Sequence, residues 1–270
     1  MLQSMIVASN ASNEPRPAAA AVGDGIRPLN ARSLALSTLL GTRPPSLPGH
    51  RLVALAELFG IAGGTMRTAL SRMVAAGELA ADGGRYRLVG RHLERQAAQD
   101  TGRTVPEPAW DGTWRIAIAL DDRRPLDERR RARQMLVDHR FAELRPDIWM
   151  RPANLPAPPL GSAWSVTTGT TDRDDHELVA RLWDLDAIAA RAARLHLALL
   201  RAAAPLDEED PTAIPPAFHA AAAVVRLLRT DPLLPEALTP PAWPLATLRD
   251  DYAEVEAMLD AAIRTFHAAA

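Results

Sequence analysis

The chain has 270 residues and a formal net charge of −2, with 47% hydrophobic and 24% charged residues, which suffices for two or three compact modules. It contains no cysteine, which excludes disulfides and thiolate sites, and its seven histidines never stand at the spacing that places two metal ligands on one helix face. No apolar run has the length of a membrane helix, and the N-terminus lacks a secretory signal pattern, so a cytoplasmic protein without a metal site is expected.

The charge is unevenly distributed along the chain, and all 31 basic residues are arginine. Residues 31–100 carry nine arginines and five acidic residues, whereas residues 201–270 carry five arginines and eleven acidic residues. This difference, +4 against −6, is of the kind that marks one end of a chain for a polyanion. An ordinary solvated surface explains so small an excess about equally well.

The first 100 residues divide into an arm and a helical module. Residues 1–30 are rich in Ala, Asn, Pro and Gly without apolar periodicity, which is typical of a disordered or loosely attached arm. In residues 31–100 the stretches "ARSLALSTLLG" and "GHRLVALAELFG" place leucines at helical spacing and end at glycine, where a left-handed cap is least costly. A linker with two prolines, "TGRTVPEPAWDG", follows.

Two further modules are predicted. Residues 110–173 contain a strand in "TWRIAIAL", a helix in "PLDERRRARQMLVDHR", two short strands around "RPD" and another strand in "GSAWSVTTG". This order indicates a small α+β domain of the ferredoxin-like kind. Residues 174–270 place leucines at three- and four-residue steps and predict a helical domain, in which "WDLD" can divide the first helix in two.

The second half of the first module, before its linker, carries the functional signal. "HRLVALAELFG", the short "IAGG" and the stretch from Thr65 to Ala76 have the helix, turn and helix spacing of a helix-turn-helix. On a helical wheel, apolar side chains fall on one face and short polar or basic ones on the other, which suits a helix in a DNA major groove. From the helix alone, an ordinary amphipathic surface helix is about as consistent. The outward residues are Thr68, Ser71 and Arg72, with Arg67 on the flank, where it can read a base or pair with Glu57.

A predicted hairpin follows this helix. "ELA" and "RYRLV" flank "ADGG", and Asp-Gly is a favoured two-residue hairpin turn because both central residues can take positive φ. Tyr86 and Leu88 then alternate inward, which leaves Arg85 and Arg87 outward. The pattern predicts a winged helix whose wing arginines meet phosphates.

Six ordered stretches carry a family resemblance from about Ala31 to the last helix. They are "ARSLALSTLLG", "LFGIAGGTMRTALSRMVAAGEL", "WDGTWRIAIAL", "ELRPDIWMRP", "LVARLWDLDAIA" and "RLLRTDPLLPEALTPPAWP". In this order they resemble the PaaX-type transcriptional repressors of phenylacetate catabolism. The resemblance implies a winged-helix DNA-binding domain, a ferredoxin-like central domain and a helical C-terminal domain.

The same resemblance implies a homodimer that binds double-stranded operator DNA, needs no cofactor and releases the operator on binding an aromatic acyl-CoA thioester. The chain departs from the family pattern before the second helix, where Ala62, Gly63 and Gly64 replace a Ser-Glu type cap, so Thr65 is the expected cap. The residues expected to contact DNA are Thr65, Arg67, Thr68, Ser71, Arg72, Arg85 and Arg87.

Two alternatives to a ligand-responsive repressor remain. Asp121 and Asp122, just past the first central strand, have the position and chemistry of a magnesium site in a metal-dependent nuclease. A charged strand end is the more common explanation, and no accompanying acid, base or nucleophile is present, so no enzyme is expected. A ligand-insensitive DNA-binding dimer differs from the repressor only in whether a ligand lowers operator affinity.

The sequence does not assign residues to an effector site. The tryptophans are more typical of a protein core, and the arginines at 129–133 are more typical of a solvated surface.

Overall fold

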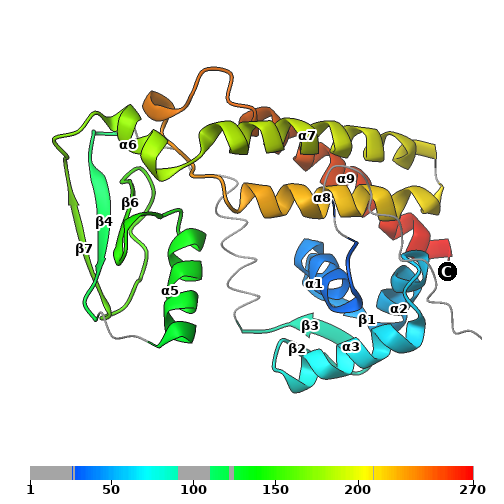
Figure 1. Ribbon diagram of the computed structural model, residues 1–270. Helices are drawn as coiled ribbons and strands as arrows, with labels where there is room; N and C mark the ends of the chain where they lie inside the picture. Colours follow the sequence, from blue (N-terminus) through cyan, green and yellow to red (C-terminus); the bar gives the residue numbers. More distant parts are fainter. Residues whose placement is uncertain (1–25, 27, 91–109, 122–124, 209, 270) are drawn as a thin grey trace, which may run out of the picture.

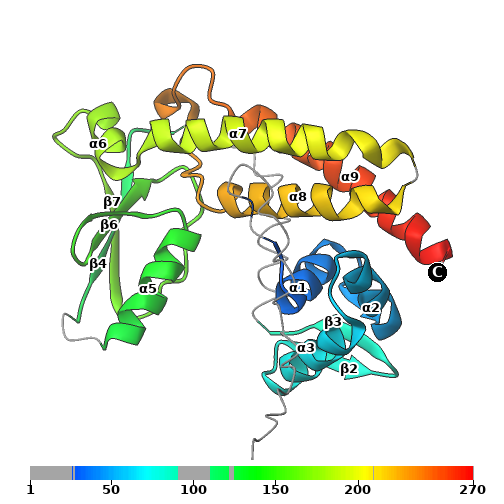
Figure 2. The same ribbon diagram turned by 45° about the vertical axis from the view of Figure 1, so that its right-hand side comes forward.

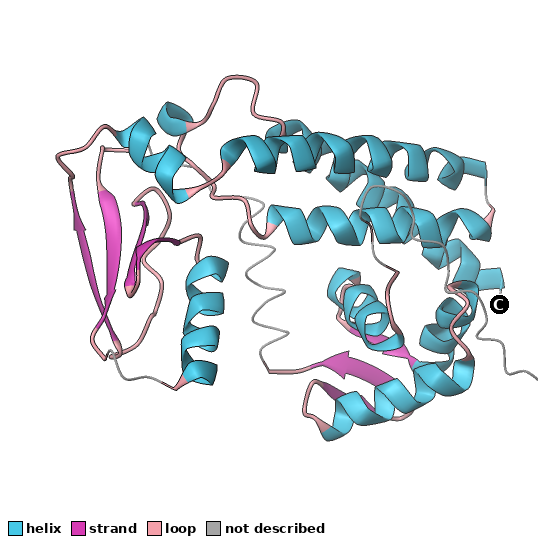
Figure 3. Cartoon of the chain, viewed as in Figure 1, coloured by secondary structure: helices cyan, strands magenta, loops and turns pink. Residues whose placement is uncertain are grey.

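The computed structural model describes residue 26 and residues 28–90, 110–121, 125–208 and 210–269, which form two small sheets and a helical assembly (Figures 1 and 3). The N-terminal elements are α1 (Ala31–Gly41), β1 (Ser46–Pro48), α2 (Gly49–Leu58), α3 (Gly63–Ala75), β2 (Leu79–Asp82) and β3 (Arg85–Leu88). The central elements are β4 (Trp114–Ala119), α5 (Leu126–Asp138), β5 (Ala142–Arg145), β6 (Ile148–Pro152) and β7 (Trp164–Gly169). The C-terminal elements are α6 (Asp175–Leu182), α7 (Leu185–Ala203), α8 (Ile214–Leu228) and α9 (Leu245–Ala269), with the 3₁₀ turns η1 (Ala204–Glu208), η2 (Pro211–Ala213) and η3 (Glu236–Leu238).

The N-terminal elements have the arrangement of a winged helix-turn-helix. The side chain of Asn30 caps α1 by accepting a hydrogen bond from the Ser33 amide at 2.9 Å. The helices α2 and α3 follow one another across a short turn, and an antiparallel sheet in the order β1-β3-β2 completes the domain. The helix, turn, helix and hairpin predicted from the sequence are all present.

The turn of the hairpin differs by one residue from the prediction. Asp82 pairs across the ladder with Arg85, so the two turn residues are Gly83 and Gly84 and not the expected Asp-Gly pair. Both glycines have positive φ, +52° and +77°. This turn keeps the strained conformation on residues without a Cβ atom, whereas the predicted turn would put Asp82 in the left-handed region.

One apolar core joins the N-terminal domain to the C-terminal helices. Buried residues of α1, α2 and α3 and of α7, α8 and α9 belong to a single cluster. Phe59, just after α2, packs edge-on against Phe218 of α8 with ring centroids 5.4 Å apart. The Leu29 amide donates a hydrogen bond to Nε2 of His219 on α8 at 3.1 Å. In Figures 1 and 2 α1 lies between α8 and α3, so α3 is on the side of the domain turned away from the helical assembly.

The start of the packed chain lies earlier than the sequence boundary. Ile26, which the sequence assigns to the arm of residues 1–30, is 2% exposed in this core. The linker region at residues 91–109, including the predicted end of the first module, lies outside the described residues.

The central domain is a four-stranded antiparallel sheet in the order β5-β6-β4-β7. One face packs against α5, and the other packs against α6, which contributes Leu178 and Val179. The expected ferredoxin-like fold has a helix before its second strand and another before its fourth. Here α5 supplies the first, but residues 153–163 are a connection with prolines at 156, 158 and 159. Proline lacks an amide hydrogen and disfavours helix, so α6 follows the last strand instead.

Two of the C-terminal helices, α6 and α7, begin at capping aspartates. Asp174 accepts a hydrogen bond from the Glu177 amide at 3.0 Å, and Asp184 accepts one from the Ala187 amide at 2.9 Å. The second cap explains why the "WDLD" stretch separates α6 from α7, as the sequence indicates. Within the described ranges, no helix has both the length and the apolar character that a membrane crossing requires.

Trp114 is the residue whose loss should disturb the central domain most. It is 0% exposed, and its Nε1 donates to Oδ1 of Asp175 at 2.7 Å. We expect Trp114→Ala to lower the free energy of unfolding by about 3–5 kcal/mol because it leaves a large cavity. Val166→Ala on the same sheet, at a side chain 40% exposed, should cost less than about 1 kcal/mol. Urea unfolding followed by far-ultraviolet circular dichroism measures both, and equal losses would contradict this packing.

Candidate nucleic-acid interface

The helices α2 and α3 approach each other closely at Gly63. A Cβ atom at this position would lie 2.5 Å from Oε1 of Glu57 and 2.9 Å from Cγ1 of Val53, both on α2. The turn between the helices is closed by the Ile61 amide, which donates to the Ala56 carbonyl at 2.8 Å. Only a residue without a side chain lets α3 begin this close to α2, so Gly63 sets the angle at which α3 is presented.

The face of α3 opposite the core is exposed, as the helical wheel predicts. Met66, Leu70 and Met73 are at most 2% exposed and anchor the helix in the shared core. The five α3 residues predicted to contact DNA all lie on the solvent side; they are Thr65, Arg67, Thr68, Ser71 and Arg72. Since α3 lies at the edge of the molecule in both views, this face is accessible to a large partner (Figures 1 and 2).

The helix begins earlier than the sequence indicates, and Thr65 is not its cap. The N-cap position is Ala62, whose side chain makes no capping hydrogen bond. The Thr65 amide donates to the Ala62 carbonyl at 2.9 Å, which places Thr65 within the first turn. The N-terminus of α3 therefore keeps amide hydrogens without a side-chain cap, and such an end favours an anion such as phosphate.

Arg67 lies at the edge of the exposed face, beside α2. Its Nη2 lies 3.5 Å from the position of a Gly63 Cβ atom, in the same corner as the Glu57 carboxylate. The two side chains make no ion pair within 4.0 Å in the described part of the chain. A cavity of about 390 Å³ between α2, α3 and the hairpin is bordered by Arg67, Glu57 and Tyr86. The Arg67 side chain thus borders this cavity on one side and solvent on the other.

The hairpin is fastened to the start of α2. The Gly49 amide donates to the Gly84 carbonyl at 2.8 Å, and a Cβ atom on Gly49 would lie 2.9 Å from the ring of Tyr86. The tip of the hairpin is therefore held at a fixed position relative to the helix-turn-helix.

The side chains of the hairpin alternate as predicted, with Arg85 and Arg87 exposed, Tyr86 half-buried and Leu88 buried. Nη2 of Arg85 also donates to the Ser46 carbonyl of β1 at 3.2 Å, a partner that the sequence analysis missed. The short β1 follows Pro45 and ends at Pro48, so it carries no periodic signal. A backbone carbonyl as a partner also leaves no trace in residue type.

The arginines on this surface differ in their partners. Arg32 on α1 forms an ion pair with Glu78 at 2.5 Å. Arg67, Arg72 and Arg87 have no carboxylate within ion-pair distance among the described residues. Their guanidinium donors are available to an external anion, and short polar side chains between them let a groove approach the backbone.

The alternative metal site receives no further residues from the structure. Asp121 is exposed beyond the end of β4, and Asp122 lies outside the described residues. Across the ranges that the structure describes, no three His, Asp or Glu side chains are grouped closely enough to hold a metal ion.

Two protein-family models match the N-terminal and C-terminal parts of the chain. A family model described as PaaX-like protein matches residues 30–91, and one described as PaaX-like protein C-terminal domain matches residues 183–269. Among solved structures, the chain is similar to the uncharacterized protein Rv0674 from Mycobacterium tuberculosis, at 34% identity and a TM-score of 0.69, over 88% of this chain and 99% of that chain. A search of curated proteins found no match to the chain.

Two neighbouring glycines provide a matched test of the α2–α3 contact. Gly63→Ala should destabilise the protein by about 1–3 kcal/mol because the new methyl group overlaps Val53. Gly64→Ala, where no atom lies within 4 Å of the new Cβ, should stabilise it by about 0.5–1 kcal/mol because alanine favours helix. Thermal unfolding of the two variants measures the difference. Equal effects of the same sign would show that α3 does not approach α2 as described.

Proposed function

Because the chain belongs to the PaaX-like protein family, we propose that it is a dimeric transcriptional repressor that binds operator DNA through α3 and the β2–β3 hairpin. Membership of this family implies a transcriptional regulator. The further steps, from regulator to repressor and from DNA to a particular operator, are supported by the surface of α3 and by the resemblance of the sequence.

The observation that carries the proposal is the exposed face of α3. It combines Thr68 and Ser71, which are short, with arginines that lack a carboxylate partner in the described chain. The hydroxyl of Thr68 donates back to the Gly64 carbonyl at 3.0 Å, so it stays close to the helix and leaves room for base edges. A helix of this kind fits a major groove, and the nearby hairpin arginines suit the flanking phosphates.

We infer dimerisation from the short length of DNA that one such domain can read. A single recognition helix addresses only a short half-site, and two linked copies gain specificity because their binding energies add within one complex. We assign dimerisation and ligand sensing to the central and C-terminal domains. The central sheet is interpreted as a ferredoxin-like domain in which a proline-rich connection replaces one helix.

The effector and the regulated genes are proposed from the resemblance. An aromatic acyl-CoA thioester is the expected effector, and an aromatic-acid catabolic operon is the expected target. On this proposal the repressor leaves its operator when the thioester accumulates.

Arg67 is the proposed base-reading residue. Its guanidinium can address both acceptors of a guanine, which discriminates by about 1–3 kcal/mol against other bases. We expect Arg67→Ala to reduce the preference for one base at one operator position, measured as relative affinities for a set of single-base operator variants. An unchanged ranking of these variants, in a protein with a wild-type circular dichroism spectrum, would contradict the assignment.

Arg87→Ala is the matched control for phosphate contact. Arg87 is exposed on the hairpin, so its loss should weaken all operator variants alike. The slope of log affinity against log salt should fall by about one counterion. A sequence-dependent loss at Arg87 would instead place the hairpin against base edges.

A further inference from the structure

Two histidines lie where the winged-helix domain meets the C-terminal helices. His219 is on α8, next to the segment that leads into α1, and His267 is in the last turn of α9, close to the start of α2. Figure 1 shows the end of α9 beside α2. Both rings are partly buried. Histidine ordinarily titrates near pH 6.5, so the surroundings of these rings decide how the contact responds to mild acid.

The hydrogen bonding of His219 requires a neutral ring. The Leu29 amide donates to Nε2 at 3.1 Å, so this nitrogen is the acceptor and the ring proton is on Nδ1. The ring also meets that of Phe59, which follows α2, with centroids 5.3 Å apart. Burial lowers the pKa of His219; the Pro215 carbonyl on the same helix opposes this, and the positive charge of Arg226 adds to it. Protonation of Nε2 turns the acceptor into a donor, which sets two N–H groups against each other.

His267 faces positive charge from the winged-helix domain. Both of its ring nitrogens are buried and have no hydrogen-bond partner among the described residues. The ring of Phe266 lies 5.4 Å away, from centroid to centroid. Burial lowers the pKa of His267, and Arg51 and then His50, both on α2, lower it further. A proton on this ring therefore adds a poorly solvated charge beside the Arg51 guanidinium.

The two rings at the contact are not offset by carboxylates. Neither His219 nor His267 has a carboxylate within ion-pair distance in the described ranges. His196 is different, because its Nε2 pairs with Oδ2 of Asp251 between α7 and α9, inside the helical assembly. The surroundings of the histidines at the domain contact thus oppose protonation, whereas the histidine within the assembly has a carboxylate partner.

The direction of the pH effect follows from these surroundings. A histidine released from the contact titrates near its ordinary pKa of about 6.5, whereas His219 and His267 in the attached domain titrate lower. Between the two values the separated state binds more protons than the attached state, so the free energy that holds the domains together falls as the pH falls. It has its full value above about pH 6.5 and stops falling below the lower pKa of the attached state.

We propose that protonation of His219 and His267 weakens the attachment of the winged-helix domain to α8 and α9, so that the domain is held firmly at neutral pH and loosely in mild acid. The ligand of this device is the proton. Since α3 belongs to the winged-helix domain, the orientation of its exposed face then depends on pH. The device does not rest on the proposed function, and it is tested without DNA.

Hydrogen exchange of the full chain, followed by mass spectrometry at pH 7.5 and 5.5, measures the attachment. Each rate is divided by the intrinsic exchange rate at the same pH, which gives the protection. Because one apolar core joins the domains, protection in α1 and α2 includes the stability of the contact and should fall at least about five-fold. Protection in α7, where His196 faces Asp251, should change less than about two-fold. Unchanged protection in α1 and α2 would overturn the proposal.

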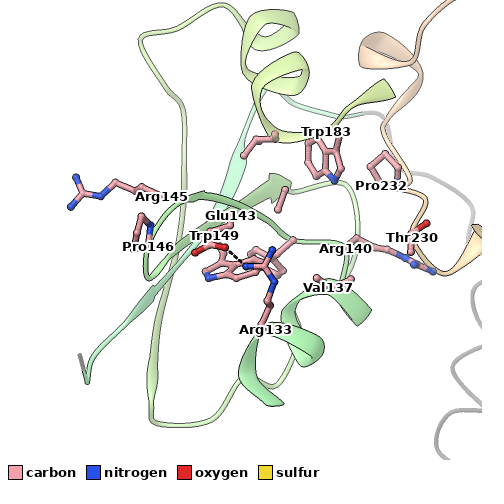
Figure 4. A pocket seen from close by; sticks show the side chains of 13 residues that line it. Arg133, Val137, Arg140, Glu143, Arg145, Pro146, Trp149, Trp183, Thr230 and Pro232 are labelled. Carbon is pink, nitrogen blue, oxygen red and sulfur yellow. Dashed lines mark hydrogen bonds and ion pairs between the residues drawn. The ribbon is translucent and has the colours of Figure 1, made fainter. Parts of the chain in front are cut away.

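The measurement is local because another histidine responds to acid. His139 stands next to Arg140, which lines a cavity of about 470 Å³ (Figure 4). The pKa of His139 is also lowered, first by burial and then by the positive charge of Arg151. Global unfolding curves would therefore combine acid effects from both regions, whereas peptides of α1 and α2 report on the domain contact.

Variants identify the two histidines as the cause. His219→Gln keeps a side-chain acceptor for the Leu29 amide, and His267→Leu keeps an apolar group, but neither new side chain titrates. The double variant should lose the pH dependence of α1 and α2, with a change below about two-fold. His176→Gln, at an exposed position on α6, should keep the wild-type fall. A double variant that falls as much as the wild type would place the cause elsewhere.

Ring titrations by nuclear magnetic resonance add a measurement that needs no variant to fold. In the wild-type chain, the pKa values of His219 and His267 should both lie below the ordinary value of about 6.5. Values at or above it would overturn the proposal, because the attached and separated states would then not differ in the required direction.

Discussion

The shared apolar core between the N-terminal domain and helices α7, α8 and α9 is the constraint on which the other features depend. The winged helix buries α1 between α3 and α8, so the inner side of the domain is occupied by the chain's own helices. The exposed face of α3 is consequently turned outward. A domain that shares its core with its neighbours moves with them, which relates the orientation of α3 to whatever shifts those helices.

Close backbone approaches convert this packing into a defined surface. Gly63 lets α3 begin against α2, and Gly49 lets the start of α2 contact the hairpin. Both approaches fix α3 and the hairpin relative to each other. Arg67, Arg72 and Arg87 can then bind an external anion, because none of them has a carboxylate within ion-pair distance among the described residues.

Much of this fold could be predicted from the sequence because its signals are local. Leucine periodicity gave the helices, and the alternation of Tyr86 and Leu88 with arginines gave the hairpin. The turn, however, lies at Gly83 and Gly84, since strand register depends on pairing with a partner that a local pattern does not contain. The helix start at Gly63 was missed for a related reason: its stability comes from contact with α2 and not from a cap. The exposed residues of α3 were predicted, whereas the neighbours of His219 and His267 come from distant segments and required the fold.

The most direct measurement of the central claim is selection of DNA from a library of randomised duplexes by the full-length chain. If α3 reads DNA in a dimer, the enriched sequences contain an inverted repeat, with half-site centres about one helical turn or a multiple of it apart. Loss of this enrichment when Arg67, Ser71 and Arg72 are replaced together by alanine assigns the reading to α3. Retention of DNA without any enriched sequence, or the same repeat selected by the replaced protein, would contradict it.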